Sequence, residues 1–129
     1  MFENLVEFEE FKGKTPVEIE GKEGDQQVNF KFKDGSEYKM FHIQDCCEDV
    51  RLEEIIGNLD NLIDYEILSA EEVTSTEDPE GYNPEYPEWR ESYTWTFYKL
   101  STIRGDVTLR WLGESNGYYG EEVDIEKII

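Results

Sequence analysis

The sequence predicts an α+β fold, a mainly antiparallel twisted sheet made of two hairpin or meander units with one or two short helices packed on it. Several segments of strand length alternate apolar and polar residues, glycine-containing turns separate them, and two further segments place apolar residues at helical spacing. The chain has 129 residues, the size of one domain, so we expect residues 1–129 to form a single domain.

The first elements predicted are a helix and a strand. Apolar residues among acids over Phe2–Phe11 predict a short amphipathic helix that ends at Gly13. Residues 15–21 alternate apolar and polar side chains and predict a half-buried strand. Pro16 is confined to the start of this strand because proline donates no ladder hydrogen bond.

The strongest local pattern is a hairpin around Asp34-Gly35, between alternating segments. A two-residue loop would set Phe30 opposite Lys39. A three-residue loop over residues 33–35 instead pairs Phe30 with Tyr38 and keeps the apolar side chains on one face. The sequence therefore predicts the three-residue loop, with Gly35 in the left-handed conformation.

The middle of the chain predicts a crossover followed by a strand and a long loop. Apolar residues over 50–63 are spaced for a short helix, or for two turns broken at Gly57. Residues 65–74 predict a strand, and residues 75–91 an acidic, proline-rich loop within the domain. The aromatic residues of this loop are expected to anchor it to the body of the protein: Tyr82, Tyr86 and Trp89.

The last third of the chain predicts a meander of three strands over residues 92–103, 106–114 and 118–126. The first turn, Arg104-Gly105, sets Leu100 opposite Leu109, and the third strand is expected to pair with the second. One face is then the core side: Tyr98, Leu100, Val107, Leu109, Trp111, Val123 and Ile125.

The opposite face of the meander is also aromatic and needs either a cover or a partner. Cover by the helices and the acidic loop is the favoured interpretation, and an exposed binding patch is the alternative. The candidate binding face comprises Trp95, Phe97, Glu114, Ser115, Asn116 and Tyr118.

The chain is strongly acidic, with a formal net charge of −20. Such a surface repels phosphates, so direct nucleic-acid binding is disfavoured, while association with a basic protein is accelerated. Solubility is an alternative reason for the acidity. We expect no membrane span and no secretory signal, and hence a cytoplasmic protein with reduced thiols, with a strained vicinal disulfide as the less favoured alternative.

The only histidine and the only two cysteines lie within residues 42–50. This candidate functional corner comprises His42, Asp45, Cys46, Cys47 and Glu48. Two chemical roles are alternatives to a structural one: a zinc site, and a Cys-His nucleophile pair with Glu114 or Asn116 orienting the imidazole. Adjacent cysteines rarely bind one ion together, and nearby acids raise a thiol pKa. Structural roles are therefore favoured, with no metal, cofactor or catalytic residue assigned.

Three motifs together resemble a small family of domains of unknown function found in bacteriophage and prophage genomes. The motifs are His42-Ile43-Gln44-Asp45-Cys46-Cys47-Glu48-Asp49-Val50, Tyr93-Thr94-Trp95-Thr96-Phe97-Tyr98-Lys99-Leu100 and Gly113-Glu114-Ser115-Asn116-Gly117-Tyr118-Tyr119. The resemblance runs from about Phe8 to Ile125 and departs from the family pattern in the length of the acidic loop and at Gly120. It attaches no catalytic role to these residues.

A phage origin implies a small acidic accessory protein that binds a basic host protein in the host cytoplasm. The expected targets are nucleic-acid enzymes or anti-phage defence systems, blocked by an anti-restriction, anti-CRISPR or DNA-mimic mechanism; an enzymatic role is disfavoured. The acidic contact candidates are Glu77, Asp78, Glu80, Glu85, Glu88, Glu121 and Glu122. The alternative is a small-ligand-binding or enzymatic domain that joins the corner around His42, Cys46 and Cys47 to the face around Trp95 and Tyr118.

Overall fold

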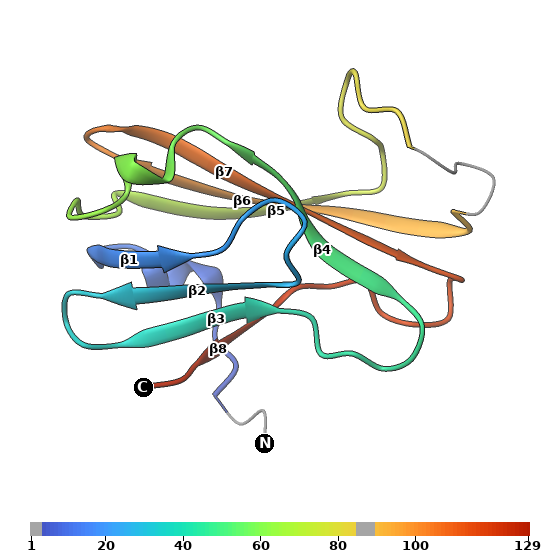
Figure 1. Ribbon diagram of the computed structural model, residues 1–129, viewed down its shortest axis with the longest axis horizontal. Helices are drawn as coiled ribbons and strands as arrows, with labels where there is room; N and C mark the ends of the chain where they lie inside the picture. Colours follow the sequence, from blue (N-terminus) through green and yellow to red (C-terminus); the bar gives the residue numbers. More distant parts are fainter. Residues whose placement is uncertain (1–3, 85–89) are drawn as a thin grey trace.

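The computed structural model describes residues 4–84 and 90–129, which form two four-stranded antiparallel sheets packed face to face (Figure 1). One sheet has the strand order β1-β2-β3-β8 and the other β4-β7-β6-β5. The strands are β1 (Pro16–Glu20), β2 (Gln27–Phe32), β3 (Glu37–Phe41), β4 (Asp49–Ile56), β5 (Ser69–Ser75), β6 (Ser92–Thr102), β7 (Gly105–Ser115) and β8 (Asp124–Lys127).

The predicted α+β class is wrong, because the regular secondary structure of the described residues is almost entirely β-strand. Its helical elements are two short 3-10 segments, η1 (Phe8–Phe11) and η2 (Leu59–Asn61). The helix predicted over Phe2–Phe11 is therefore reduced to the single turn η1, and residues 1–3 lie outside the described residues. No helix in the described ranges has the length and apolar character needed to cross a bilayer.

The helix predicted over residues 50–63 is also wrong, because strand β4 and the short η2 occupy this region. A β-bulge between Leu52 and Glu54 explains the error. Val50 and Leu52 are buried two residues apart, as in any strand, but the bulge delays the next core-facing residue to Ile55. The resulting spacing of three residues imitates the period of a helix.

The predicted hairpin is confirmed as β2 and β3, with Phe30 paired with Tyr38. Gly35 has φ = 90°, and its N–H donates to the carbonyl oxygen of Phe32 at 3.0 Å. The strand predicted over residues 15–21 is confirmed as β1, and the one predicted over residues 65–74 corresponds to the shorter β5.

The predicted meander is confirmed in its first two strands, β6 and β7, but not in its register or its third strand. The turn falls at Ile103-Arg104, so Leu100 pairs with Val107 rather than Leu109. Strand β8 leaves this sheet and pairs with β3, while β4 lies beside β7. The alternating pattern therefore predicts the strands, but the predicted sheet of the last strand is wrong.

The core lies between the two sheets and is rich in aromatic side chains. Phe11 of η1 is fully buried, and its ring centroid lies 5.0 Å from each of three others, those of Phe30, Phe32 and Tyr38. The predicted core side of the meander is confirmed, with Val123 partly buried at its margin. Its buried members are Tyr98, Leu100, Val107, Leu109, Trp111 and Ile125.

Candidate functional site

The loop between β3 and β4 holds the side chain of His42 against that of Glu48, two members of the candidate functional corner. Nε2 of His42 lies 2.7 Å from Oε2 of Glu48, and Nδ1 lies 2.6 Å from the main-chain oxygen of Glu122. A carbonyl oxygen and an ionised carboxylate only accept hydrogen bonds, so both ring nitrogens donate. Only 3% of the His42 side chain and none of the Glu48 side chain is exposed. The two residues form a buried imidazolium–carboxylate pair.

Glu48 is kept ionised by the loop that it closes. Its carboxylate also accepts the main-chain N–H groups of Asp45 and Cys46, each at 2.8 Å. Burial alone would raise the pKa of Glu48, but the hydrogen bonds from His42 and from these two amides lower it to about 2. Burial likewise opposes protonation of His42, yet its hydrogen bonds with Glu48 and Glu122 raise its pKa above the usual value.

Cys46 and Cys47 are joined by a disulfide with an S–S distance of 2.08 Å. The expectation of reduced thiols is therefore wrong. A thiol nucleophile needs a free thiolate, so the Cys-His catalytic pair is not formed, and neither cysteine offers a thiolate to zinc. The imidazole is oriented by Glu48 and the Glu122 carbonyl, not by Glu114 or Asn116. Asp45 is exposed and contributes its main-chain N–H.

Ligand atoms of His42, Glu122 and Asp124 lie within 4.8 Å of one another. Both nitrogens of His42 already donate hydrogen bonds, which leaves the ring no lone pair for a metal ion. One carboxylate oxygen of Asp124 accepts the main-chain N–H of Ile43 at 3.1 Å. These contacts join the loop after β3 to the segment that enters β8.

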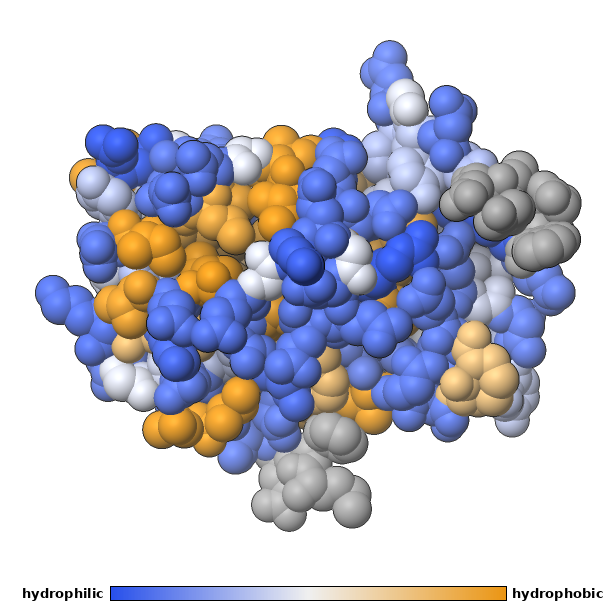
Figure 2. Space-filling model, viewed as in Figure 1, coloured by the Kyte–Doolittle hydropathy of each residue, from blue (hydrophilic) through white to orange (hydrophobic). Residues whose placement is uncertain are grey.

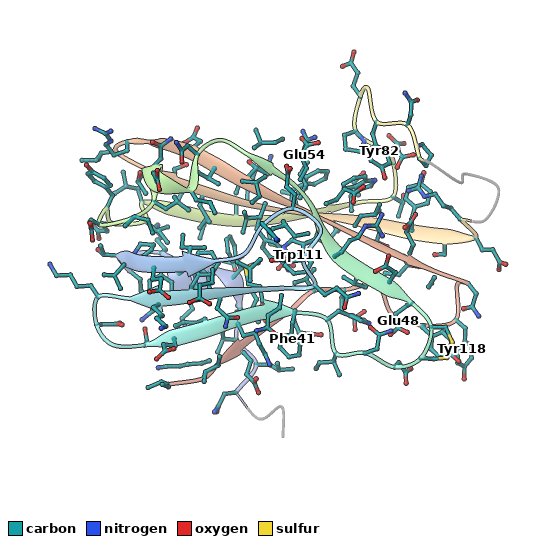
Figure 3. The ribbon with its side chains drawn as sticks, viewed as in Figure 1. Phe41, Glu48, Glu54, Tyr82, Trp111 and Tyr118 are labelled. Carbon is teal, nitrogen blue, oxygen red and sulfur yellow. A yellow bond between two sulfur atoms is a disulfide. The ribbon has the colours of Figure 1, made fainter. Side chains whose placement is uncertain are left out.

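The predicted aromatic face is covered by the acidic loop but not by the expected helices; of the predicted loop anchors, Tyr82 lies on this face, and Tyr86 and Trp89 lie outside the described residues. Trp95 is 1% exposed, and its ring packs edge-on against Tyr82 of the loop, with centroids 4.9 Å apart. Its indole N–H donates to Asp78 at 2.9 Å, and its other side stacks on Phe97. Tyr118 does not join this face, since it is 83% exposed and lies well apart from Tyr82 (Figure 3).

A cleft of about 780 Å³ lies between the acidic loop and the adjoining ends of β4 and β7. It brings Cys47 of the candidate corner together with Glu114, Ser115 and Asn116 of the predicted binding face, but not with His42 or Tyr118. The residues that line it are Cys47, Asp49, Arg51, Glu53, Tyr82, Asn83, Pro84, Arg90, Glu114, Ser115, Asn116 and Tyr119.

A continuous set of ion pairs forms one side of this cleft. Arg51 contacts Asp49, Glu53 and Glu114 at 2.5, 2.9 and 2.9 Å. The second carboxylate oxygen of Glu114 lies 2.8 Å from Nε of Arg90. Glu114 therefore bridges the two arginines and ties the acidic loop to β4 and β7.

Arg90 and Tyr82 complete this arrangement from the loop side. Arg90 donates two hydrogen bonds of 3.0 Å to Asp78, and this pairing lowers the pKa of that carboxyl. Tyr82 donates to Glu53 at 2.9 Å, and burial together with this carboxylate raises the pKa of Tyr82 to about 12. The hydroxyl of Tyr82 thus remains a hydrogen-bond donor at neutral pH.

The predicted acidic contact residues fall into three groups. Asp78 and Glu121 are internal, because Asp78 binds Arg90 and Glu121 accepts hydrogen bonds from Thr94 and Ser115. The exposed group is Glu77, Glu80 and Glu122. Two further candidates lie outside the described residues, Glu85 and Glu88.

Sequence reasoning missed the charged residues of the cleft. These are Asp49, Arg51, Glu53 and Arg90. One available signal was the scarcity of cations, 12 Lys and Arg in 129 residues, which makes an arginine between two acids conspicuous. The alternation of Asp49, Arg51 and Glu53 places them on one face only once residues 49–56 are recognised as a strand.

A family model described as "Domain of unknown function (DUF7448)" matches residues 9–125. No curated protein and no solved structure matches the chain at a significant level. The matched span includes both the His42–Glu48 pair and the cleft.

Proposed function

The chain belongs to this family of unknown function, DUF7448, and we propose that it acts by binding a basic protein through its acidic surface. The observation that carries the proposal is the uncompensated charge of −20. A field of this sign and strength accelerates encounter with a positively charged protein and repels nucleic acid.

The internal ion pairs leave most of this charge available. Within residues 4–84 and 90–129, the salt bridges engage eight carboxylates: Glu18, Asp34, Glu48, Asp49, Glu53, Glu54, Asp78 and Glu114. The whole chain has 32 acids, so the larger part of them lacks a cationic partner in these ranges. Hydrophilic side chains also dominate the right half of the face in Figure 2.

The contact residues that we propose are the exposed members of the predicted set, Glu77, Glu80 and Glu122. The proposal includes a phage or prophage origin and action in the host cytoplasm, both of which rest on the motif resemblance. Its target is a host nucleic-acid enzyme or anti-phage defence protein, whose phosphate-binding surface has the complementary charge.

The test is capture of partners from bacterial lysate at low and physiological salt, with recovered proteins identified by mass spectrometry. The expected result is a basic nucleic-acid enzyme whose binding weakens with salt and competes with duplex DNA. The variant Glu77→Gln, Glu80→Gln, Glu122→Gln should lose this binding. A matched variant of equal charge alters exposed acids elsewhere: Asp60→Asn, Glu66→Gln and Asp106→Asn.

Two outcomes contradict the proposal. One is a partner whose binding does not change between low and physiological salt, because contacts between exposed charges are screened. The other is equal loss of binding in the two triple variants, which would show that bulk charge acts without a defined contact surface.

A further inference from the structure

We propose that the cleft beside Arg51 binds an arginine-containing segment of the basic partner. This inference rests on the proposed function and names the part of the surface that recognises an arginine side chain of the partner. The sequence patterns marked four residues of this cleft, Cys47, Glu114, Ser115 and Asn116, but not its arginines, because its walls come from the acidic loop, β4, β7 and the turn after β7.

The size of the cleft fits a peptide segment rather than a single ion. Its volume of about 780 Å³ falls within the roughly 300–1,000 Å³ typical of ligand pockets. The lining combines charged groups with the aromatic rings of Tyr82 and Tyr119. An arginine side chain and its peptide neighbours have both the apolar and the cationic parts that such a lining accommodates.

The carboxylates of the cleft suit a ligand that donates hydrogen bonds. Nε and Nη1 of Arg51 and both Nη groups of Arg90 donate to carboxylates, while Nε of Arg90 lies within ion-pair distance of Glu114 without a hydrogen bond. Asp49 and Glu53 each accept hydrogen bonds from two described side chains, and Glu114 accepts one from Arg51. A carboxylate has about four acceptor positions, so acceptor capacity remains after the internal pairs are formed.

The charge of the cleft selects a cation. Two guanidinium groups face three carboxylates among the lining residues, which leaves one net negative charge within a chain of net charge −20. An anionic ligand would be repelled by the net negative charge of the cleft and by that of the whole chain. Asp49 is the most accessible of the three carboxylates, with 48% of its side chain exposed against 23% for Glu53 and Glu114.

A planar guanidinium suits this cleft better than an ammonium group. The guanidinium of Arg90 already lies 3.8 Å from the ring centroid of Tyr93 and 5.9 Å from that of Tyr82. The same kind of contact is open to a ligand at the aromatic walls, and arginine combines stacking with several donors in a fixed plane. The ion pairs of Arg51 and Glu114 hold the acceptors in place before the ligand arrives.

The test uses a fluorescein-labelled hexa-arginine peptide as the probe, with binding followed by anisotropy at low and physiological salt. Asp49→Asn and Glu53→Gln should each weaken binding roughly tenfold, since each removes one cleft charge and its hydrogen bonds. Asp106→Asn is the matched control, because this exposed acid lies at the other end of β7, roughly 26 Å from Glu114 along the strand. It should change binding less than about twofold. Circular dichroism and thermal unfolding check that each variant is folded.

The outcomes separate this inference from the proposed function. Salt-sensitive binding that is equal in wild type, Asp49→Asn and Glu53→Gln would overturn the cleft site while leaving the acidic surface as the binder. Absence of salt-sensitive binding to the wild-type protein would contradict both. Equal affinity for hexa-lysine, or equal competition by spermine, would overturn recognition of the guanidinium group.

Discussion

The imidazole of His42 and the carboxylate of Glu48 form a buried ion pair, with Nε2 and Oε2 2.7 Å apart. The pair joins two parts of the chain, because the other nitrogen of His42 donates to the carbonyl oxygen of Glu122, 80 residues away. The same carboxylate closes the disulfide loop through the amides of Asp45 and Cys46. The protonated imidazole of His42 therefore links the loop after β3 to the segment before β8.

This pair predicts a specific pH dependence of stability. The raised pKa of His42 means that its contribution is complete below about 6.5 and is lost as pH rises through the folded-state pKa. The lowered pKa of Glu48 means that its contribution is complete above about 4.5 and is lost as pH falls through about 2. The pair thus stabilises the fold most between about pH 4.5 and 6.5.

The measurement compares urea unfolding of the wild type and of the double variant His42→Gln, Glu48→Gln at pH 5.5 and pH 8.5. The wild-type advantage should be larger at pH 5.5. His42 is the only histidine, so its titration can be followed directly by NMR. The carboxylates that face it are Glu48, Glu122 and Asp124. A His42 pKa at or below 6.5 would contradict the assignment of an imidazolium.

Replacing glycine with alanine is expected to destabilise the fold much more at Gly113 than at Gly120. Gly113→Ala should destabilise the fold by about 1–3 kcal/mol, because its Cβ would overlap the main-chain oxygen of Glu121 and lie 2.8 Å from that residue's Cβ. The three atoms nearest to an added Cβ at Gly120 all belong to the carboxylate of exposed Glu122, which can rotate away. Gly120→Ala should therefore cost less than about 1 kcal/mol. Chemical unfolding of both variants decides between these expectations, and equal losses would contradict them.

The disulfide between Cys46 and Cys47 is expected to contribute little to global stability. It links adjacent residues and so restricts almost none of the unfolded chain. Glu48 holds the loop by its own hydrogen bonds. The variant Cys46→Ser, Cys47→Ser should unfold cooperatively within about 1 kcal/mol of the wild type. Loss of a cooperative transition in this variant, or on reduction of the wild type, would show that the disulfide itself maintains the fold.

The parts of the fold that were predictable from sequence are those specified by neighbouring residues. The β2–β3 register follows from Gly35 and from the alternation on each side of it, since only one loop length keeps the apolar faces together. The pairing of β8 was not predictable in this way. Ile125 alternates with polar neighbours whether it packs beside β7 or beside β3, and the pattern carries no information about the partner strand.

The candidate site, like the fold, has one part that the sequence predicts and another that depends on long-range contacts. The segment from His42 to Glu48 was recognised because its residue types are unique in the chain. Its actual chemistry depends on Glu122, whose carbonyl oxygen no residue pattern identifies. The cleft depends on Arg51 and Arg90, which are brought together by the return of the acidic loop onto the outer face of β6 and β7. Long-range contacts of this kind follow from the tertiary packing and not from local spacing.

Asp78 is predicted to hold the acidic loop against the sheet by its bonds to Arg90 and Trp95. Asp78→Ala removes both anchors and should expose Arg90, whose side chain is only 7% accessible in the folded protein. Trypsin should then cleave after Arg90 roughly tenfold faster, since local opening governs cleavage of folded chains. Asp49→Ala is the control, because it removes a partner of Arg51 and leaves the Arg90 contacts in place. If trypsin cleaves both variants at the wild-type rate, the Asp78 contacts do not hold the loop, and the cleft wall that the loop forms requires another anchor.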